Sequence, residues 1–243
     1  MRIPRFYFPG VLALGARVTL PKDAAHHAAR VLRMGEDDVV SLFNGDNHVY
    51  RARIFRIEKQ DIVVLIESRV AMSCESTLSL LLVQGISSGE RMDYTLQKAV
   101  ELGVTAIQPI QAERSVVKLA GERREKRMQH WRNVVTAACE QCGRNKVPEV
   151  KAVAGLMDWL GVQGSEGQRI LLAPDAEMRL RELAQPVGVV TLAVGPEGGF
   201  SDNEHTALMQ YGFTPVKLGP RVLRTETAAL AALASMQTLW GDF

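Results

Sequence analysis

Two glycine-proline loops are the segments of this sequence best suited to hold a ligand. Gly195–Gly199 reads GPEGG and follows an apolar run, and Gly219–Thr227 reads GPRVLRTET after another. Proline fixes φ and lacks an amide donor, whereas glycine permits positive φ, so each Gly-Pro pair predicts a rigid bend with exposed backbone groups. Ligands of open α/β sheets bind beyond the carboxyl ends of the strands, where we expect both loops to lie.

Neither loop matches a common nucleotide-binding motif. A Walker A loop needs a lysine followed by Ser or Thr after its last glycine, and a dinucleotide fingerprint needs G-x-G-x-x-G; both patterns are absent. Glu197 would repel a polyphosphate. The first loop therefore favours a neutral or positively charged ligand, and S-adenosylmethionine, a sulfonium without phosphate, fits. The alternative is a tight strand–helix connection in which Glu197 only favours the N-terminus of the next helix.

The second loop carries Arg221 and Arg224 on either side of an apolar pair, followed by Thr225 at the start of a helix. Two arginines at such a loop favour a nearby anion, and an RNA phosphate is one candidate. Thr225 is also suited to cap the helix, which requires no ligand.

The elements that must position these loops fall into two regimes. Up to about residue 70 the runs are short and β-like: Val39–Phe43, the turn at Asn44-Gly45, and an alternating run from His48, with one helical piece at Asp23–Met34. An Asn-Gly pair between alternating runs is a strong hairpin signal, and several short strands predict a small barrel.

Beyond the small polar segment Ala71–Thr77, apolar runs alternate with amphipathic ones. Expected strands lie at Leu78–Ile86, Val104–Ile110, Arg169–Ala173, Val189–Val194 and Pro215–Gly219; expected helices lie at Glu90–Leu102, Glu122–Gln141, Ser201–Gly212 and Thr225–Trp240. This alternation predicts a parallel sheet covered on both faces. We therefore expect a β-barrel domain over residues 1–71 and an α/β domain over 72–243.

Composition and charge narrow the class of protein. The chain has 243 residues and a net charge of +2. Pro4 and Pro9 interrupt any N-terminal signal segment, no apolar run reaches the ~18–20 residues that cross a bilayer, and an odd count of three cysteines argues against a disulfide framework. These features predict a cytoplasmic protein without a membrane partner.

Basic residues cluster in two places. Residues 1–60 hold ten Lys/Arg against six Asp/Glu, and a second cluster occupies Arg123–Arg132, interleaved with Glu122 and Glu125. Clustered cations can neutralise RNA phosphates. The alternative for the second cluster is a solvated helix face.

The pair Cys139 and Cys142 reads C-x-x-C, and His26-His27 form a second group of metal-ligand type. Structural zinc needs about four ligands, and the sequence has neither a second C-x-x-C nor a matching histidine pair. We therefore predict no metal site.

Taken together, the two loops, GPEGGFSDNE and LGPRVLRTETAAL, resemble the paired cofactor loops of the SPOUT class of RNA methyltransferases. Further motifs resemble the RsmE family, which methylates N3 of a uridine in 16S rRNA near the decoding region: MRIPRFY, HHAARVLRM, ISSGERMDYTLQKAVELGV, AACEQCGRN and the C-terminal WGD. The resemblance covers essentially the whole chain.

This resemblance implies a PUA-like barrel that helps to hold RNA and a C-terminal SPOUT domain with a deep trefoil knot. It also implies a homodimer and, as partner, 16S rRNA within the assembled small subunit. The cofactor loops fall on Leu172, Ala173, Gly195, Pro196, Glu197, Gly198, Gly199, Leu218, Gly219, Pro220, Val222 and Leu223. Residues expected to face RNA are Arg2, Arg5, Arg30, Arg33, Glu140, Gln141, Arg144 and Arg221. For Arg144 the alternative is a contact with helix carbonyls.

Methylation at N3 requires loss of the N3 proton, so a base or a stabilising cation must lie near the target. Arg224 is the candidate for the target phosphate or the uracil anion, Glu226 is the candidate base, and Glu197 is the second candidate. Two rival functions stay open: a catalytically silent RNA-binding or assembly factor of the same fold, and a nucleotide-dependent α/β oxidoreductase, which would need the absent phosphate loop.

Overall fold

The structure, a computed structural model, describes residues 3–59, 61–162, 164 and 166–243, and the chain divides into two compact units. The N-terminal unit comprises Met1–Glu75 and Cys139–Val147, and the C-terminal unit comprises Ser76–Ala138 and Pro148–Phe243. The N-terminal unit thus includes the end of a helix that begins in the other unit. The predicted domain boundary at residue 71 stays a prediction.

The N-terminal unit is built on a five-stranded sheet with the order β1-β3-β4-β5-β2. Its strands are β1 (Arg5–Tyr7), β2 (Arg17–Thr19), β3 (Val39–Phe43), β4 (His48–Glu58) and β5 (Asp61–Ala71). β3 and β4 pair antiparallel across the predicted Asn-Gly turn, and β5 returns along β4. The predicted helical piece is present as α1 (Lys22–His26) followed by a π-helical turn, η1 (His27–Val31).

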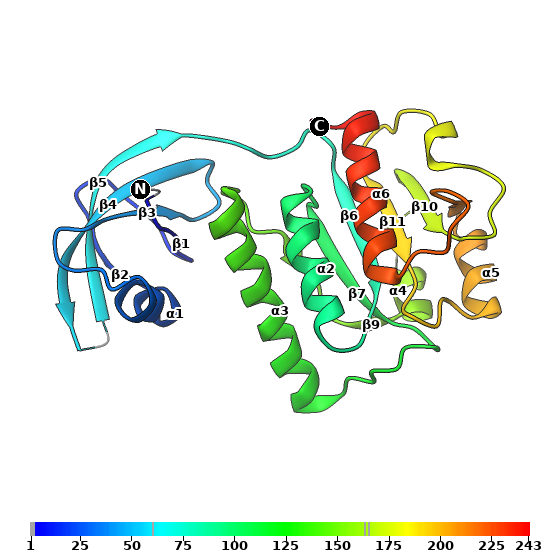
Figure 1. The fold of residues 1–243 in the computed structure, drawn as a ribbon, viewed down its shortest axis with the longest axis horizontal. Coiled ribbons are helices and arrows are strands. Elements are labelled where there is room, and N and C mark those ends of the chain that lie inside the picture. The colour runs from blue at the N-terminus through cyan, green and yellow to red at the C-terminus, as the bar shows by residue number, and fades with distance from the viewer. Residues whose placement is uncertain (1–2, 60, 163, 165) are drawn as a thin grey trace. The chain divides into compact units, whose positions relative to one another are not determined.

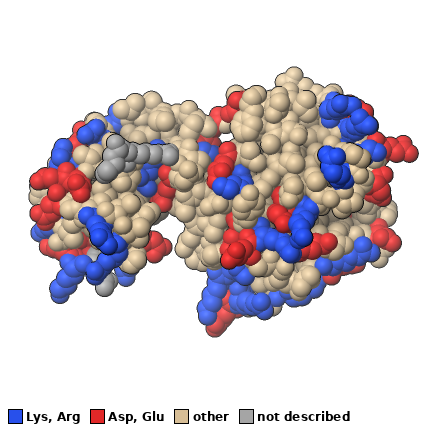
Figure 2. Space-filling view, viewed as in Figure 1, with Lys and Arg blue, Asp and Glu red and all other residues tan. Residues whose placement is uncertain are grey.

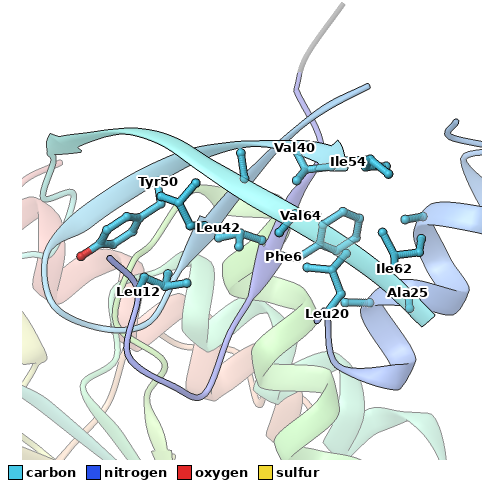
Figure 3. Packing of buried hydrophobic residues seen from close by; sticks show 14 residues of the cluster. Phe6, Leu12, Leu20, Ala25, Val40, Leu42, Tyr50, Ile54, Ile62 and Val64 are labelled. Atoms are coloured by element: carbon cyan, nitrogen blue, oxygen red, sulfur yellow. The ribbon is translucent and has the colours of Figure 1, made fainter. Parts of the chain in front are cut away.

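The core of this unit follows from the alternation along β4. Tyr50, Ala52 and Ile54 are buried, whereas Arg51 and Phe55 between and beyond them are exposed. Figure 3 shows the buried side chains of β4 together with those of β1, β3 and β5, among them Phe6, Leu42 and Val64. One apolar face therefore holds the sheet to α1.

The C-terminal unit contains a parallel sheet with the order β12-β10-β11-β6-β7-β8, and β9 also pairs with β7. The strands are β6 (Leu80–Gly85), β7 (Ala106–Gln111), β8 (Glu149–Val150), β9 (Ala154–Gly155), β10 (Gln168–Leu172), β11 (Val190–Val194) and β12 (Thr214–Val216). Every pairing among these strands is parallel. The predicted α/β domain is confirmed; the knot stays a prediction.

Helices cover the sheet, as Figure 1 shows. They are α2 (Glu90–Glu101), α3 (Gly121–Cys142), α4 (Leu156–Gly161), α5 (Asp202–Gln210) and α6 (Thr225–Trp240), with a 3-10 turn, η2, at Leu180–Glu182. α2 packs against α6, while α4 and α5 bring Trp159 and Leu208 to a buried cluster with Ala193 of β11. Within the described residues, no helix is both long and apolar enough to cross a membrane.

The sheet order places three loops together. β10 lies between β11 and β12, with Leu171 opposite Ala193 and Leu172 opposite Val216. Because the strands are parallel, their carboxyl ends meet at one edge of the sheet. The segments that follow Leu172, Val194 and Val216 therefore converge there.

Candidate active site

A pocket of about 700 Å³ opens at this edge of the sheet. Its walls are the loops after β10, β11 and β12 and the first turn of α6. All the predicted cofactor residues except Pro220 line it: Leu172, Ala173, Gly195, Pro196, Glu197, Gly198, Gly199, Leu218, Gly219, Val222 and Leu223. Pro220 lines a neighbouring pocket instead.

The Gly195–Gly199 loop is a tight turn that needs its glycines. The Gly199 amide donates to the Pro196 carbonyl at 2.9 Å, and a Cβ on Gly195 would lie 3.0 Å from the Gly199 backbone. A Cβ on Gly85, at the end of β6, would lie 2.3 Å from the Pro196 nitrogen. Only glycine at positions 85 and 195 allows these backbones to approach so closely.

Glu197 ties this loop to the start of α2. Its Oε1 accepts hydrogen bonds from the amide and the hydroxyl of Ser88, both at 2.8 Å, and from Nη1 of Arg91 at 2.9 Å. Burial by itself would raise the pKa of the Glu197 carboxyl, but the hydrogen bonds from Ser88, from its own amide and from Arg91 lower it to about 2. A carboxylate with so low a pKa is a weak base, so the geometry favours a positioning role for Glu197.

Thr225 joins two of the loops rather than capping α6. The N-cap residue is Arg224 and no side chain caps the helix, so the expectation that Thr225 is the N-cap is wrong. The buried Thr225 hydroxyl donates to the Gly195 carbonyl at 2.5 Å and accepts from the Gln84 amide at 3.0 Å. The long-range partners outcompete the local cap, because Thr225 faces the loop after β11.

Glu226 lies in the pocket wall beside Arg91. Its Oε1 is 4.0 Å from Nε of Arg91, and among the described residues its buried Oε2 has no hydrogen-bond partner. An unpaired carboxylate oxygen that lines a pocket is free to accept a proton or a hydrogen bond from a ligand. Arg221 and Arg224 also line this pocket, and both are exposed.

The sequence-based prediction missed Arg91, which bridges Glu197 and Glu226 from the first turn of α2. It lies 106 residues from Glu197 in the chain, so no spacing rule connects them. The available signal was chemical: Arg91 is a basic residue in the first turn of a helix, where a positive charge is unfavourable, and the GPEGG loop holds an acid without a counterion of its own. Pro174, Val194, Val216, Lys217 and Ala228 complete the lining and were also not predicted.

Comparison with known proteins places this geometry in a family. The model of the RNA methyltransferase domain matches residues 74–237, and that of the RNA methyltransferase PUA domain matches residues 20–67. Ribosomal RNA small subunit methyltransferase E of Buchnera aphidicola subsp. Schizaphis graminum is 37% identical over 99% of this chain and 98% of its own length. The chain belongs to the RsmE family of RNA methyltransferases.

Two solved structures support this placement in the RsmE family. Ribosomal RNA small subunit methyltransferase E from Neisseria gonorrhoeae, bound to S-adenosyl methionine, is 43% identical with a TM-score of 0.92, and all of both chains is covered. A methyltransferase from Legionella pneumophila in complex with SAM is 41% identical with a TM-score of 0.96, again over all of both chains. The predicted PUA-like and SPOUT domains are confirmed.

The residues expected to face RNA in this RsmE-family chain have different surroundings. Arg30 and Arg33 are exposed. Arg5 instead donates to the carbonyls of Gly143 and Arg144 at 3.0 and 3.1 Å, at the C-terminal end of α3. Arg5 thus stabilises that helix end, and Arg2 lies outside the described residues.

The end of α3 holds the other predicted residues. Glu140 accepts a hydrogen bond from the Tyr7 amide at 3.0 Å, and burial raises its pKa. Arg144 is buried and its Nη2 lies 2.6 Å from Oε2 of Glu75, while Gln141 is exposed. The alternative for Arg144, a contact with helix carbonyls, describes Arg5 better than Arg144, which pairs with a carboxylate.

The cysteines have surroundings of two kinds. Cys139 is buried and burial raises the pKa of its thiol to about 12, while the exposed Cys74 thiol donates to the Gly143 carbonyl at 3.0 Å. A thiol with so high a pKa is neutral and unreactive. Among the described residues, no group of three or more His, Cys, Asp and Glu side chains is placed to hold a metal ion.

Proposed function

We propose that this chain transfers a methyl group from S-adenosylmethionine to N3 of one uridine in 16S rRNA, near the decoding region of the small ribosomal subunit. Methylation of small-subunit rRNA is the activity for which its RsmE-family relatives are named. The observation that carries the proposal is the pocket at the carboxyl ends of β10, β11 and β12, which brings aliphatic walls, two acids and three arginines together.

The lining fits S-adenosylmethionine. Leu172, Leu218 and Leu223 offer apolar surface to an adenine ring, and the tight Gly195–Gly199 turn offers backbone groups to its edge. When bound, this cofactor supplies an activated methyl group on a positively charged sulfur.

The chain's own residues must remove the uracil proton. The unpaired Oε2 of Glu226 supports its role as the acceptor of the N3 proton, whereas the Glu197 carboxylate is held by three hydrogen-bond donors from Ser88 and Arg91. The N3 lone pair then forms the new bond to the methyl carbon as the carbon–sulfur bond breaks, with its electron pair going to sulfur. Glu226 holds the proton until solvent takes it.

Arg224 and Arg221 bind negatively charged groups of the RNA. Both arginines lie in the loop that lines the pocket, and the exposed Arg224 directly precedes α6. We assign Arg224 to the target phosphate or to the uracil anion, and Arg221 to a neighbouring phosphate. Because N3 is on the pairing edge, the target base must be unpaired or flipped out.

We further propose that the enzyme acts in the cytoplasm as a homodimer on the assembled small subunit. Phe243, beyond the C-terminal end of α6, is exposed, which supports an apolar contact with a second copy. Arg30 and Arg33 of the PUA domain remain accessible for RNA.

The test is methyl transfer from labelled S-adenosylmethionine to small subunits from cells that lack this gene. We expect label in 16S rRNA and none in large subunits. Tight RNA binding without any label would favour the rival function, a catalytically silent assembly factor.

A further inference from the structure

A second pocket of about 600 Å³ shares a wall with the cofactor pocket. Lys217, Leu218 and Gly219, which follow β12, line both cavities. The second pocket is otherwise formed by residues 179–181 around η2 and by the C-terminal half of α6. It contains none of the candidate catalytic residues.

The charge of this second pocket is positive. Arg179, Arg181 and Lys217 line it, and in the described part of the chain no acidic side chain does. The nearby Glu182 carboxylate accepts the Arg179 amide at 2.8 Å and is thereby turned to the backbone of η2. Ser235 adds a hydroxyl from α6. Figure 2 shows Lys and Arg side chains on the surface over this side of the C-terminal unit.

Backbone pairing holds two of these cations together. Arg179 and Lys217 form a parallel β-bridge, in which the Lys217 amide donates to the Met178 carbonyl at 2.9 Å and the Leu180 amide donates to the Lys217 carbonyl at 3.2 Å. Paired residues of a bridge point to the same side, so the two positive charges are kept close without a counterion from this pocket. An anion between them relieves that repulsion.

We propose that this second pocket is a phosphate subsite that binds the RNA backbone beside the target uridine. The inference rests on the proposed function, because the shared wall at Lys217–Gly219 is what links the subsite to the reacting base. Arg179 and Arg181 act as charge-assisted hydrogen-bond donors to phosphate oxygens. A free phosphate ion has the same chemistry, and the experiment distinguishes the two sources.

The experiment uses the full chain with Arg179→Gln and Arg181→Gln combined. We expect the KM for small subunits to rise about tenfold at low salt, with kcat and the Kd of S-adenosylmethionine unchanged. The slope of log KM against log salt should fall by about 1. The doubly conservative variant, with lysine at both positions, should recover most of the affinity and the slope.

The matched control is Arg124→Gln with Lys126→Gln. It removes the same charge from α3, where each cation already has a carboxylate partner, Glu125 at 3.7 Å and Glu122 at 3.8 Å. We expect the control to change KM by less than about twofold.

Three results would overturn the subsite. An unchanged KM and salt slope in the glutamine variant would do so directly. Binding of inorganic phosphate that the variant abolishes, with KM unchanged, would assign the pocket to a free anion. Loss of self-association in light scattering, with KM unchanged, would assign it to a contact between copies of the chain.

Failure of the proposed function is recognised separately. If the wild-type protein transfers no methyl group, that function fails. The subsite is then tested by measuring the affinity of the wild type and of the glutamine and lysine variants for a labelled 16S rRNA fragment without cofactor.

Discussion

Arg91 and Glu197, far apart in the sequence, form an ion pair with Nη1 and Oε1 at 2.9 Å. The pair closes the tip of the GPEGG loop onto the first turn of α2, and the same guanidinium lies 4.0 Å from Oε1 of Glu226. One cation thus contacts both the GPEGG loop and the candidate base.

Replacing Arg91 by Gln should loosen the cofactor loop. The guanidinium is partly exposed, so the pair contributes about 1 kcal/mol, and the Kd of S-adenosylmethionine should rise about fivefold in calorimetry. Lys98→Gln is the control, since Lys98 lies on the same helix and pairs with Glu101 away from the pocket. Equal affinities of the wild type and Arg91→Gln for S-adenosylmethionine would show that the loop does not need the ion pair with Arg91.

The low pKa of Glu197 predicts a pH dependence of stability. Its pKa is lowered from 4.5 to about 2 in the folded chain, so the stabilisation is fully present above pH 4.5 and is lost as the pH falls towards 2. At neutral pH the free energy of unfolding in urea should be higher for the wild type than for Glu197→Gln by an amount of order 2 kcal/mol. The difference should shrink below pH 4.5; a difference that stayed constant down to pH 3 would contradict the assignment.

Glu226→Gln should slow the chemistry and leave binding intact. Removing a general base lowers the single-turnover rate of methyl transfer by about a hundredfold or more. The Kd of S-adenosylmethionine should change little, because the amide keeps the shape of the side chain. Glu122→Gln, an exposed acid of α3, is the control. A near-normal rate in Glu226→Gln would remove Glu226 as the base.

Arg144 and Glu75 should behave as a structural pair of the N-terminal unit. Nη2 of Arg144 is 2.6 Å from Oε2 of Glu75, and both side chains are largely buried. Arg144→Gln leaves a buried carboxylate without its partner and should lower the free energy of unfolding by about 3 kcal/mol. The double variant with Arg144→Gln and Glu75→Gln should lose clearly less free energy of unfolding than the sum of the losses in the two single variants. Additive losses, together with a raised KM for small subunits, would instead favour RNA contact by Arg144.

The sequence predicted the longer strands and helices and the two glycine-proline loops because their signals are local. The short elements β1, β2, β8, β9 and α4 were not predicted. Asn44-Gly45 marks a hairpin, and the helix expected at Ser201–Gly212 begins with a capping box formed by Ser201 and Glu204. The loops Gly195–Gly199 and Gly219–Leu223 could be placed because parallel strands end at a common edge.

The contacts that complete the site are long-range and leave no such signal. Thr225 bonds Gly195 and Gln84 in place of its own helix end, and Arg5 bonds the carbonyls at the end of α3, 138 residues further along the chain. Thr225 suits the predicted helix cap equally well, and Arg5 suits the predicted RNA contact. Only the packing within each unit decides which partner each one takes.

The most direct test of the central claim is the identity of the methylated atom. Small subunits from cells lacking this gene should be treated with the enzyme and S-adenosylmethionine, and their 16S rRNA mapped by reverse transcription and digested to nucleosides for mass spectrometry. A single new stop at a uridine near the decoding region, with 3-methyluridine as the only new nucleoside, is the predicted result. A methylated nucleoside without a reverse-transcription stop would place the methyl group away from the pairing edge and contradict methylation at N3.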